Sequence, residues 1–107
     1  MVATGNGGEG VYAKLKRLIA TNVTASNNGG SGIDGHPVRA IAVTANDNAD
    51  AGLISARVVS VRDSTVTGNG AVHGGLDIQS ERRPRVRNTT CGYNFGAAGS
   101  WGVCTND

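Results

Sequence analysis

Polar and apolar residues alternate in short stretches along the chain. Apolar residues take every second position at 11–15, 59–62 and 76–79. A period of two residues is typical of β-strands. Glycine, asparagine and β-branched residues recur within and between these stretches, and they disfavour helix. The pattern therefore predicts an all-β chain built from short strands.

A longer period is superimposed on this alternation, because asparagines return at nearly equal intervals along the chain. These residues are Asn6, Asn28, Asn48, Asn69 and Asn94. A glycine followed by an aliphatic residue comes after the first four, and the glycines are Gly10, Gly32, Gly52 and Gly75. A fixed period of about 20 residues indicates stacked coils, so we expect a solenoid.

The chemistry of asparagine and glycine explains why such coils would repeat them. Stacked positions lie about 4.8 Å apart, and an amide can donate to one neighbour and accept from the other. Asparagine ladders of this kind stabilise stacked strands, and glycine permits tight backbone turns. We interpret the repeated asparagines and the repeated glycines as structural. The alternative is that the asparagines form an external ladder that binds ice or sugar.

Composition supports a narrow coil and limits the classes of partner. The chain has 107 residues with 17 glycines and 4% aromatics, too few large side chains for a two-layer core. Its formal net charge of +2 is too small to indicate nucleic acid. No apolar stretch is long enough to span a membrane. The N-terminus lacks the basic and apolar regions of a signal peptide.

The repeat resembles that of the right-handed parallel β-helices of the pectin-lyase-like superfamily, which includes pectate lyases, polygalacturonases and phage tailspikes. The resemblance rests on the segment Val61–Asn69, followed by Gly74–Ile78, and it covers nearly the whole chain. It implies a right-handed, single-stranded parallel β-helix of about four to five coils over residues 1–90. Residues 91–107 are similar to the C-terminal end of secreted bacterial β-helix repeat proteins, and would form a cap.

Two cysteines, Cys91 and Cys104, lie in this C-terminal segment. An even pair close in sequence suits a local disulfide and a secreted, periplasmic or cell-surface protein. Two free thiols in a cytosolic protein are the alternative. A disulfide without a signal peptide leads us to expect that the chain is the C-terminal part of a longer protein. Trp101 would cover the open end of the stack, or alternatively would stack on a sugar.

Polysaccharide-active members of the superfamily work on an outer strand face, which directs attention to one outward column. The repeat places Tyr12, Asp34, Ile54 and Asp77 in that column. Asp34 and Asp77 would be about 10 Å apart, marginal for the two carboxylates of an inverting glycosidase. These two residues are the catalytic candidates; the alternative is that they are solvated surface acids.

Other candidate chemistry is sparse. Asp47 and Asp50 share a turn and could supply oxygen ligands to Ca²⁺, although aspartate is also favoured in turns for conformational reasons. His36 and His73 have no metal-ligand spacing around them. We therefore expect no cofactor, with Ca²⁺ as the one alternative.

The densest charge lies at residues 81–87, where Arg85 and Arg87 follow Arg82 and Arg83. This run lacks the interleaved aromatic residues of single-strand nucleic-acid sites. Contact with an acidic polysaccharide or lipopolysaccharide is one interpretation, and a solvated loop is the other. Tyr12, Arg85 and Arg87 are the ligand-binding candidates.

These observations favour a non-catalytic β-helix module of a secreted or surface bacterial protein, acting as a scaffold or as a surface that contacts glycans. Its partners would be a polysaccharide and further coils of a longer parent chain, and not nucleic acid. The alternatives are a fragment or divergent member of a polysaccharide lyase or glycoside hydrolase, and an adhesin or phage-type stalk.

Overall fold

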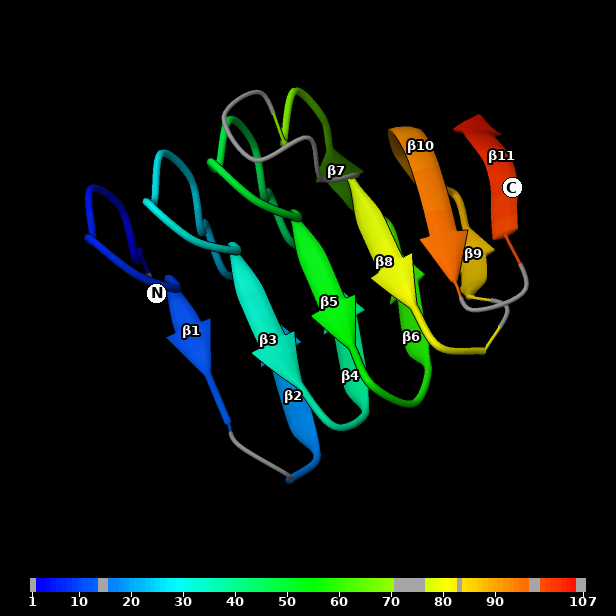
Figure 1. Cartoon of the computed structure of the whole chain (residues 1–107), viewed down its shortest axis with the longest axis horizontal. Coiled ribbons are helices and arrows are strands. Elements are labelled where there is room, and N and C mark those ends of the chain that lie inside the picture. Colours follow the sequence, from blue (N-terminus) through cyan, green and yellow to red (C-terminus); the bar gives the residue numbers. More distant parts are fainter. Residues whose placement is uncertain (1, 14–15, 71–76, 83, 97–98, 106–107) are drawn as a thin grey trace.

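The chain folds into a parallel β-solenoid, as its computed structural model shows (Figure 1). The structure describes residues 2–13, 16–70, 77–82, 84–96 and 99–105; from residue 92 onward it describes the backbone alone. All the elements in these ranges are strands, which confirms the all-β class. The described part of the chain contains no helix that is long and apolar enough to cross a membrane.

Two sheets run the length of the solenoid and face away from each other. The front sheet in Figure 1 has the order β1-β3-β5-β8-β10-β11, and β7 pairs with β10. Its strands are β1 (Val11–Tyr12), β3 (Ile33–Gly35), β5 (Leu53–Ser55), β7 (Thr65–Val66), β8 (Ile78–Ser80), β10 (Thr90–Gly96) and β11 (Gly99–Thr105). The back sheet has the order β2-β4-β6-β9. Its strands are β2 (Leu18–Thr21), β4 (Val38–Ile41), β6 (Val59–Arg62) and β9 (Arg85–Arg87).

The strands of successive coils pair in parallel and in register. Ile33 aligns with Leu53, and Leu53 aligns with Ile78. A third side of the coil is held by single bridges that join Thr24 to Thr44 and Thr44 to Thr65. Each coil therefore contributes one short segment to each of three sides, as a repeat of about 20 residues requires.

The core is a stack of identical positions. Ile33, Leu53 and Ile78 are fully buried and lie above one another. On the third side, Val66 aligns with Cys91, and both are buried. A side chain removed from such a column leaves a cavity, and burial of this kind stabilises by about 2–5 kcal/mol per large aliphatic residue.

The asparagine column forms the predicted ladder. Asn6 Nδ2 donates to Asn28 Oδ1 at 2.9 Å, Asn28 Nδ2 to Asn48 Oδ1 at 2.9 Å, and Asn48 Nδ2 to Asn69 Oδ1 at 2.8 Å. Each Oδ1 also accepts from the backbone N–H of the preceding asparagine. Asn28 and Asn48 are buried, so these bonds satisfy amides that would otherwise be costly to remove from water.

Glycine recurs in its column because a side chain there would collide with the asparagine ladder. A Cβ on Gly32 would lie 2.8 Å from Asn48 Nδ2 and 2.7 Å from the carbonyl oxygen of Gly52. A Cβ on Gly52 would likewise lie 2.6 Å from Asn69 Nδ2. Each of these glycines therefore makes room for the asparagine of the following coil.

The fourth coil departs from the expected register. The structure aligns Leu53 with Ile78, so Asp77 and Ile78 take the places of Gly52 and Leu53. The expected pair Gly75 and Leu76 lies outside the described residues. The alignment of Gly75 with the glycine column was therefore wrong, because more residues separate Asn69 from its strand than separate the earlier asparagines from theirs.

The stack is shorter than predicted, at about three turns instead of four to five. The chain after β9 forms β10 and β11, which pair antiparallel as a hairpin instead of making another coil. Asn94 lies in β10 and its backbone aligns with Ile78, so it is in a strand rung and not in the turn that carries the other asparagines.

Cys91 lies in β10, the first strand of this hairpin, and its side chain is buried. The register that aligns Thr90 with Thr105 puts the backbones of Cys91 and Cys104 on neighbouring strands. The side chains of Cys104 and Trp101 lie outside the described residues, so the disulfide and the tryptophan cap stay predictions.

Candidate functional site

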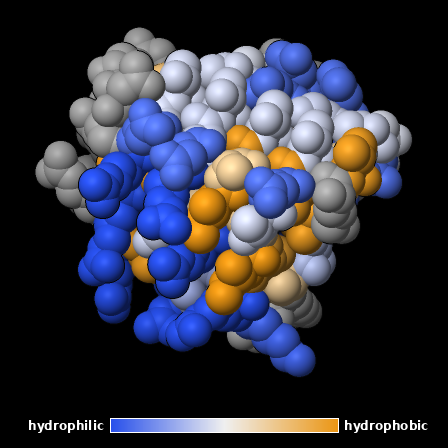
Figure 2. Space-filling view, turned by 180° about the vertical axis from the view of Figure 1, so that it is seen from behind, coloured by the Kyte–Doolittle hydropathy of each residue, from blue (hydrophilic) through white to orange (hydrophobic). Residues whose placement is uncertain are grey.

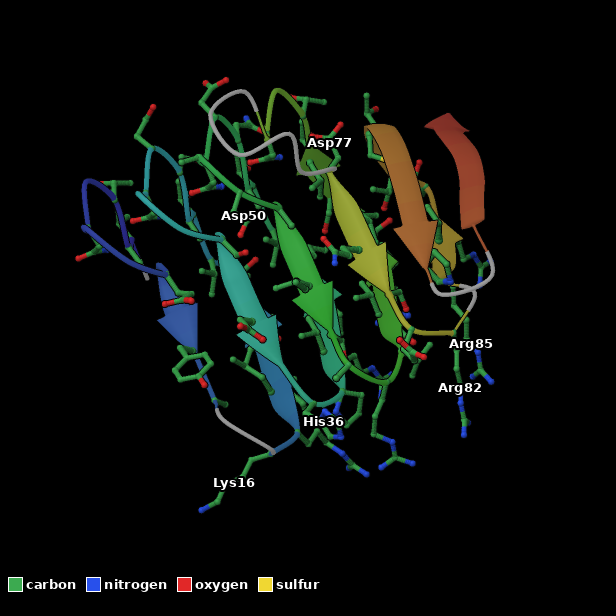
Figure 3. All side chains as sticks on the ribbon, viewed as in Figure 1. Lys16, His36, Asp50, Asp77, Arg82 and Arg85 are labelled. Atoms are coloured by element: carbon green, nitrogen blue, oxygen red, sulfur yellow. The ribbon has the colours of Figure 1, made fainter. Side chains whose placement is uncertain are left out.

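Charge is segregated across the solenoid even though the net charge is small. Figure 3 shows Asp50 and Asp77 at the edge that carries the asparagine turns, and Lys16, Arg82 and Arg85 toward the opposite edge. Charges of one sign can therefore gather locally although the total is nearly neutral, and a small net charge does not exclude a charged binding surface.

The outward column of the front sheet does not contain the expected pair of acids. Its register aligns Tyr12 with Asp34, Asp34 with Ile54, and Ile54 with Gln79. The placement of Asp77 in this column was wrong, because the fourth strand begins one residue after Asp77. Asp34 is therefore the only carboxylate among the residues that the structure aligns in this column.

Asp77 instead ends the asparagine ladder. Its Oδ1 accepts from the backbone N–H of Asn69 at 3.0 Å and from Asn69 Nδ2 at 2.9 Å. These are the two bonds that the next asparagine would otherwise accept. Asp77 is 6% exposed and stands in the glycine column, so its side chain fills the space that a following asparagine would occupy.

The surroundings of Asp34 make its carboxylate harder to ionise. Partial burial raises the pKa of Asp34, the nearby negative charges of Glu9 and Asp50 raise it further, and His36 acts in the opposite direction. A raised pKa can mark a catalytic acid, but such an acid works with a second group that the aligned column does not supply.

The calcium candidates do not gather into a recognisable metal site. No group of three or more histidine, cysteine or acidic residues with metal-binding geometry occurs among the residues described. Asp47 has a φ of 56°, in the left-handed region where aspartate is tolerated better than most residues. This accounts for an aspartate at position 47 through turn conformation.

The back sheet presents a different kind of surface, which we call the arginine face. It comprises the outward residues of β4, β6 and β9, namely Arg39, Ile41, Ser60, Arg62, Arg85 and Arg87. The register aligns Arg39 with Ser60 and Ser60 with Arg85 in one column, and Ile41 with Arg62 and Arg62 with Arg87 in the other. Strand alternation explains the placement, because the residues between them point into the core.

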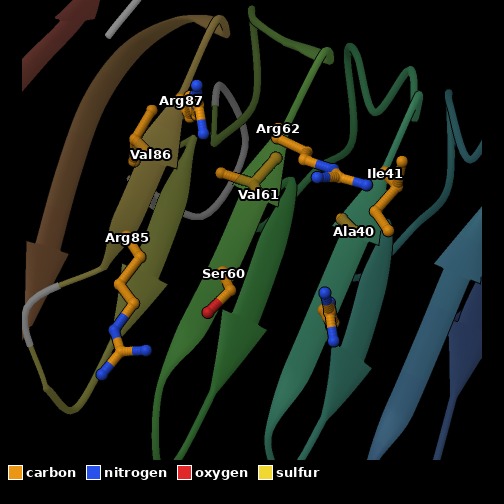
Figure 4. Close-up of a pocket in the computed structure, with 9 residues that line it drawn as sticks. Ala40, Ile41, Ser60, Val61, Arg62, Arg85, Val86 and Arg87 are labelled. Carbon is orange, nitrogen blue, oxygen red and sulfur yellow. The ribbon is translucent and has the colours of Figure 1, made fainter.

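A hollow of about 370 Å³ lies over this face, and all six residues line it (Figure 4). A second hollow of about 210 Å³ continues toward β2 and shares Arg39 and Ser60 with the first. Ile19, Pro37 and Val58 add apolar surface to the second hollow. Figure 2 shows this side of the molecule, where hydrophilic residues gather beside an apolar strip.

The arginines of this face are not joined to acidic side chains by ion pairs among the described residues; they are Arg39, Arg62, Arg85 and Arg87. Asp63 lines a hollow together with Arg62 and Arg87, and its Oδ1 accepts from Asn88 Nδ2 at 2.7 Å. Like charges that stand opposite each other on neighbouring strands are destabilising, so Arg62 and Arg87 are held together at a cost to folding.

The structure thus separates the three predicted ligand-binding residues. Arg85 and Arg87 lie on the arginine face, whereas Tyr12 is exposed on the front sheet and belongs to the other surface. The ligand-binding candidates chosen from the sequence did not include Arg39, Arg62 and Ser60. The coil period would have found them, because the spacings between successive asparagines from Asn28 onward also align the second strand of each coil.

Comparisons with known proteins add no assignment. No protein-family model matches the chain, and neither a curated protein nor a solved structure matches it. The pectin-lyase-like resemblance and the right-handed coiling therefore stay predictions, and function has to be argued from the arginine face itself.

Proposed function

We propose that this chain is a non-catalytic β-solenoid module that binds an acidic polysaccharide along its arginine face, and that it works outside the cytoplasm. The single observation that carries the proposal is the alignment, over three neighbouring strands, of four arginines that form no ion pair among the described residues. A cluster that costs stability without internal compensation is best explained by an external anion.

The geometry suits a linear polymer. The strands repeat about every 4.8 Å, so the face offers guanidinium groups at regular steps along the solenoid axis. Guanidinium binds carboxylate through two parallel hydrogen bonds, which favours a polymer with one carboxylate on each of many units. The apolar strip at Ile19, Pro37 and Val58 would contact the less polar faces of the sugar rings.

Nucleic acid fits this face less well. Single-stranded nucleic acid is bound on aromatic platforms, and the residues that line the two hollows include no aromatic side chain. Carboxylated sugars need no such platform. Single-stranded DNA is therefore the competing polyanion in the test below.

The test measures binding of uronic-acid polymers by titration calorimetry at low and at high salt, with a neutral glucan as the negative control. We expect binding to the uronic-acid polymers that weakens with salt, because exposed charges are screened. Arg62→Ala and Arg85→Ala should each weaken binding by about tenfold, since a charged hydrogen bond is lost.

Arg57→Ala is the matched control, because it removes the same charge from an exposed arginine that lines neither hollow. It should leave the affinity within about twofold, since Arg57 is exposed, lines neither hollow, and has its charge screened by water. The proposal is wrong if no uronic-acid polymer binds at low salt, or if Arg57→Ala weakens binding as much as Arg62→Ala. Tighter binding of single-stranded DNA would replace the polysaccharide with nucleic acid.

A further inference from the structure

Three of the ladder asparagines precede a glycine, which makes each of them a potential site of spontaneous deamidation. The pairs are Asn6-Gly7, Asn28-Gly29 and Asn69-Gly70, whereas Asn48 is followed by Ala49. In this reaction the backbone nitrogen of the following residue attacks Cγ of the asparagine and Nδ2 leaves as ammonia. Water then opens the cyclic imide at either carbonyl, which gives aspartate or isoaspartate. Glycine favours the attack because it has no side chain to obstruct it.

The ladder protects these asparagines to different degrees. The side chain of Asn28 donates to Ala3 O and to Asn48 Oδ1, and it accepts from both the backbone and the side chain of Asn6. The attacking nitrogen of Gly29 is itself bonded to the carbonyl oxygen of Asn6 at 2.7 Å. Deamidation of Asn28 therefore requires the first two coils to separate.

Asn69 is held at the other end of the ladder. Its Nδ2 donates to Ala45 O at 2.8 Å and to Asp77 Oδ1 at 2.9 Å, and the nitrogen of Gly70 donates to Asn48 O at 3.0 Å. Asp77 thus closes this end, and the amide of Asn69 is bonded on both sides.

Asn6 is the first ladder asparagine among the described residues, and its side chain is exposed. Its side chain makes one hydrogen bond within the described residues, from Nδ2 to Asn28 Oδ1. No backbone carbonyl of the described chain accepts from the N–H of Gly7, and the space around Gly7 is open. One bond has to break before the nitrogen of Gly7 can reach Cγ of Asn6.

We propose that in the 107-residue chain the ladder deamidates in sequence, beginning at Asn6-Gly7 and continuing to Asn28-Gly29, and that Asn48-Ala49 slows it. The product at position 6 lacks the Nδ2 donor and sets a negative oxygen against Asn28 Oδ1. The first coil is then released, and Asn28 becomes the new exposed end. The next ladder residue, Asn48, has alanine after it, so the reaction slows there.

The experiment follows each site by peptide mass spectrometry while the folded chain is incubated in mildly alkaline buffer made with ¹⁸O water. Conversion at Asn6 should be at least about tenfold faster than at Asn28 or Asn69, because each of those requires local opening. Conversion at Asn28 should show a lag and then follow conversion at Asn6.

Two variants separate order from simple exposure. Gly7→Ala should slow conversion at Asn6 at least about tenfold and delay Asn28 with it; the open space and the absence of a positive φ at Gly7 allow the alanine. Asn6→Asp should remove the lag at Asn28 while leaving Asn69 unchanged, with the far-ultraviolet spectrum as the check on folding.

Three results would overturn the proposal. Equal rates at all three Asn–Gly pairs would show that the ladder does not protect. An unchanged rate at Asn28 in Asn6→Asp would show that the sites are not coupled. Equal acceleration of Asn28 and Asn69 in that variant would show general unfolding in place of release from one end.

Discussion

The asparagine turn, made by Asn6, Asn28, Asn48 and Asn69, and the arginine face repeat with the same period but treat their polar groups in opposite ways. In the turn, each inner amide donates and accepts within the stack. On the arginine face, four guanidinium groups stand in register with no ion pair in the part of the chain that the structure describes. Repetition by itself therefore says nothing about function. What separates the two surfaces is whether the repeated polar groups are satisfied inside the molecule.

The comparison predicts that the centre of the ladder carries the larger share of stability. Asn48→Ala should lower the free energy of unfolding by roughly 4 kcal/mol, because four side-chain hydrogen bonds worth about 1 kcal/mol each are lost. Asn6→Ala should cost about 1 kcal/mol, since one such bond is lost. Urea denaturation measures both variants, and equal costs would show that the ladder is not the source of the stability.

Much of the fold could be predicted because equivalent positions of successive coils carry identical or chemically similar residues. Arg62 and Arg87 are separated by the same number of residues as Asn69 and Asn94, and so are Val66 and Cys91; the structure aligns both of these pairs. Residues at one position of a solenoid share one environment, so chemical likeness at a fixed spacing is a direct signal of contact.

The fourth coil shows where that signal fails. Leu76 and Ile78 have the same parity, so a shift of two residues leaves the inward and outward alternation unchanged. Apolar periodicity cannot detect such a shift, and Asp77 was therefore assigned to the outer column. Its place at the end of the ladder depends on the hydrogen bonds to Asn69, which the pattern does not encode.

The arginine face was only half predicted, for a different reason. Arg85 and Arg87 were noticed because they lie in a dense run of charge, whereas Arg39 and Arg62 are isolated in the sequence. Only the register of the back sheet brings the four together. A binding surface on a solenoid is spread over several coils, so a local sequence motif contains the residues of one strand of that surface at most.

The second prediction concerns the C-terminal end of the solenoid. If Cys91 pairs with Cys104, reduction should lower the free energy of unfolding by about 3 kcal/mol, since the bridge closes a short loop in the unfolded chain. Melting curves with and without reductant measure the effect. Cys104→Ser should abolish the dependence on reductant, and identical curves for the parent chain would refute the bridge.

The third prediction uses the pKa of Asp34, which lies in the outward column of the front sheet. Its folded-state pKa is raised by burial and by Glu9 and Asp50, so ionisation opposes folding. The stabilising contribution of the protonated form is complete below the unfolded pKa and is lost as pH rises through the folded pKa. Asp34→Asn should therefore be more stable than the parent at pH 7 by less than about 1 kcal/mol, because water screens this half-exposed group. The advantage should vanish in acid, and one that persists there would point to another cause.

The smallest expected effect on stability is the most informative about the arginine face. Arg62→Ala should change the free energy of unfolding by less than about 0.5 kcal/mol, because Arg62 is exposed and forms no ion pair within the described residues. The change should be in the stabilising direction, since Arg87 loses a like-charged neighbour on the adjacent strand. The same substitution should weaken polymer binding about tenfold, as argued above. In contrast to Arg62→Ala, Asn48→Ala should cause a large loss of stability. A large loss of stability in Arg62→Ala would place Arg62 with the structural columns, and the contrast between the two surfaces would then disappear.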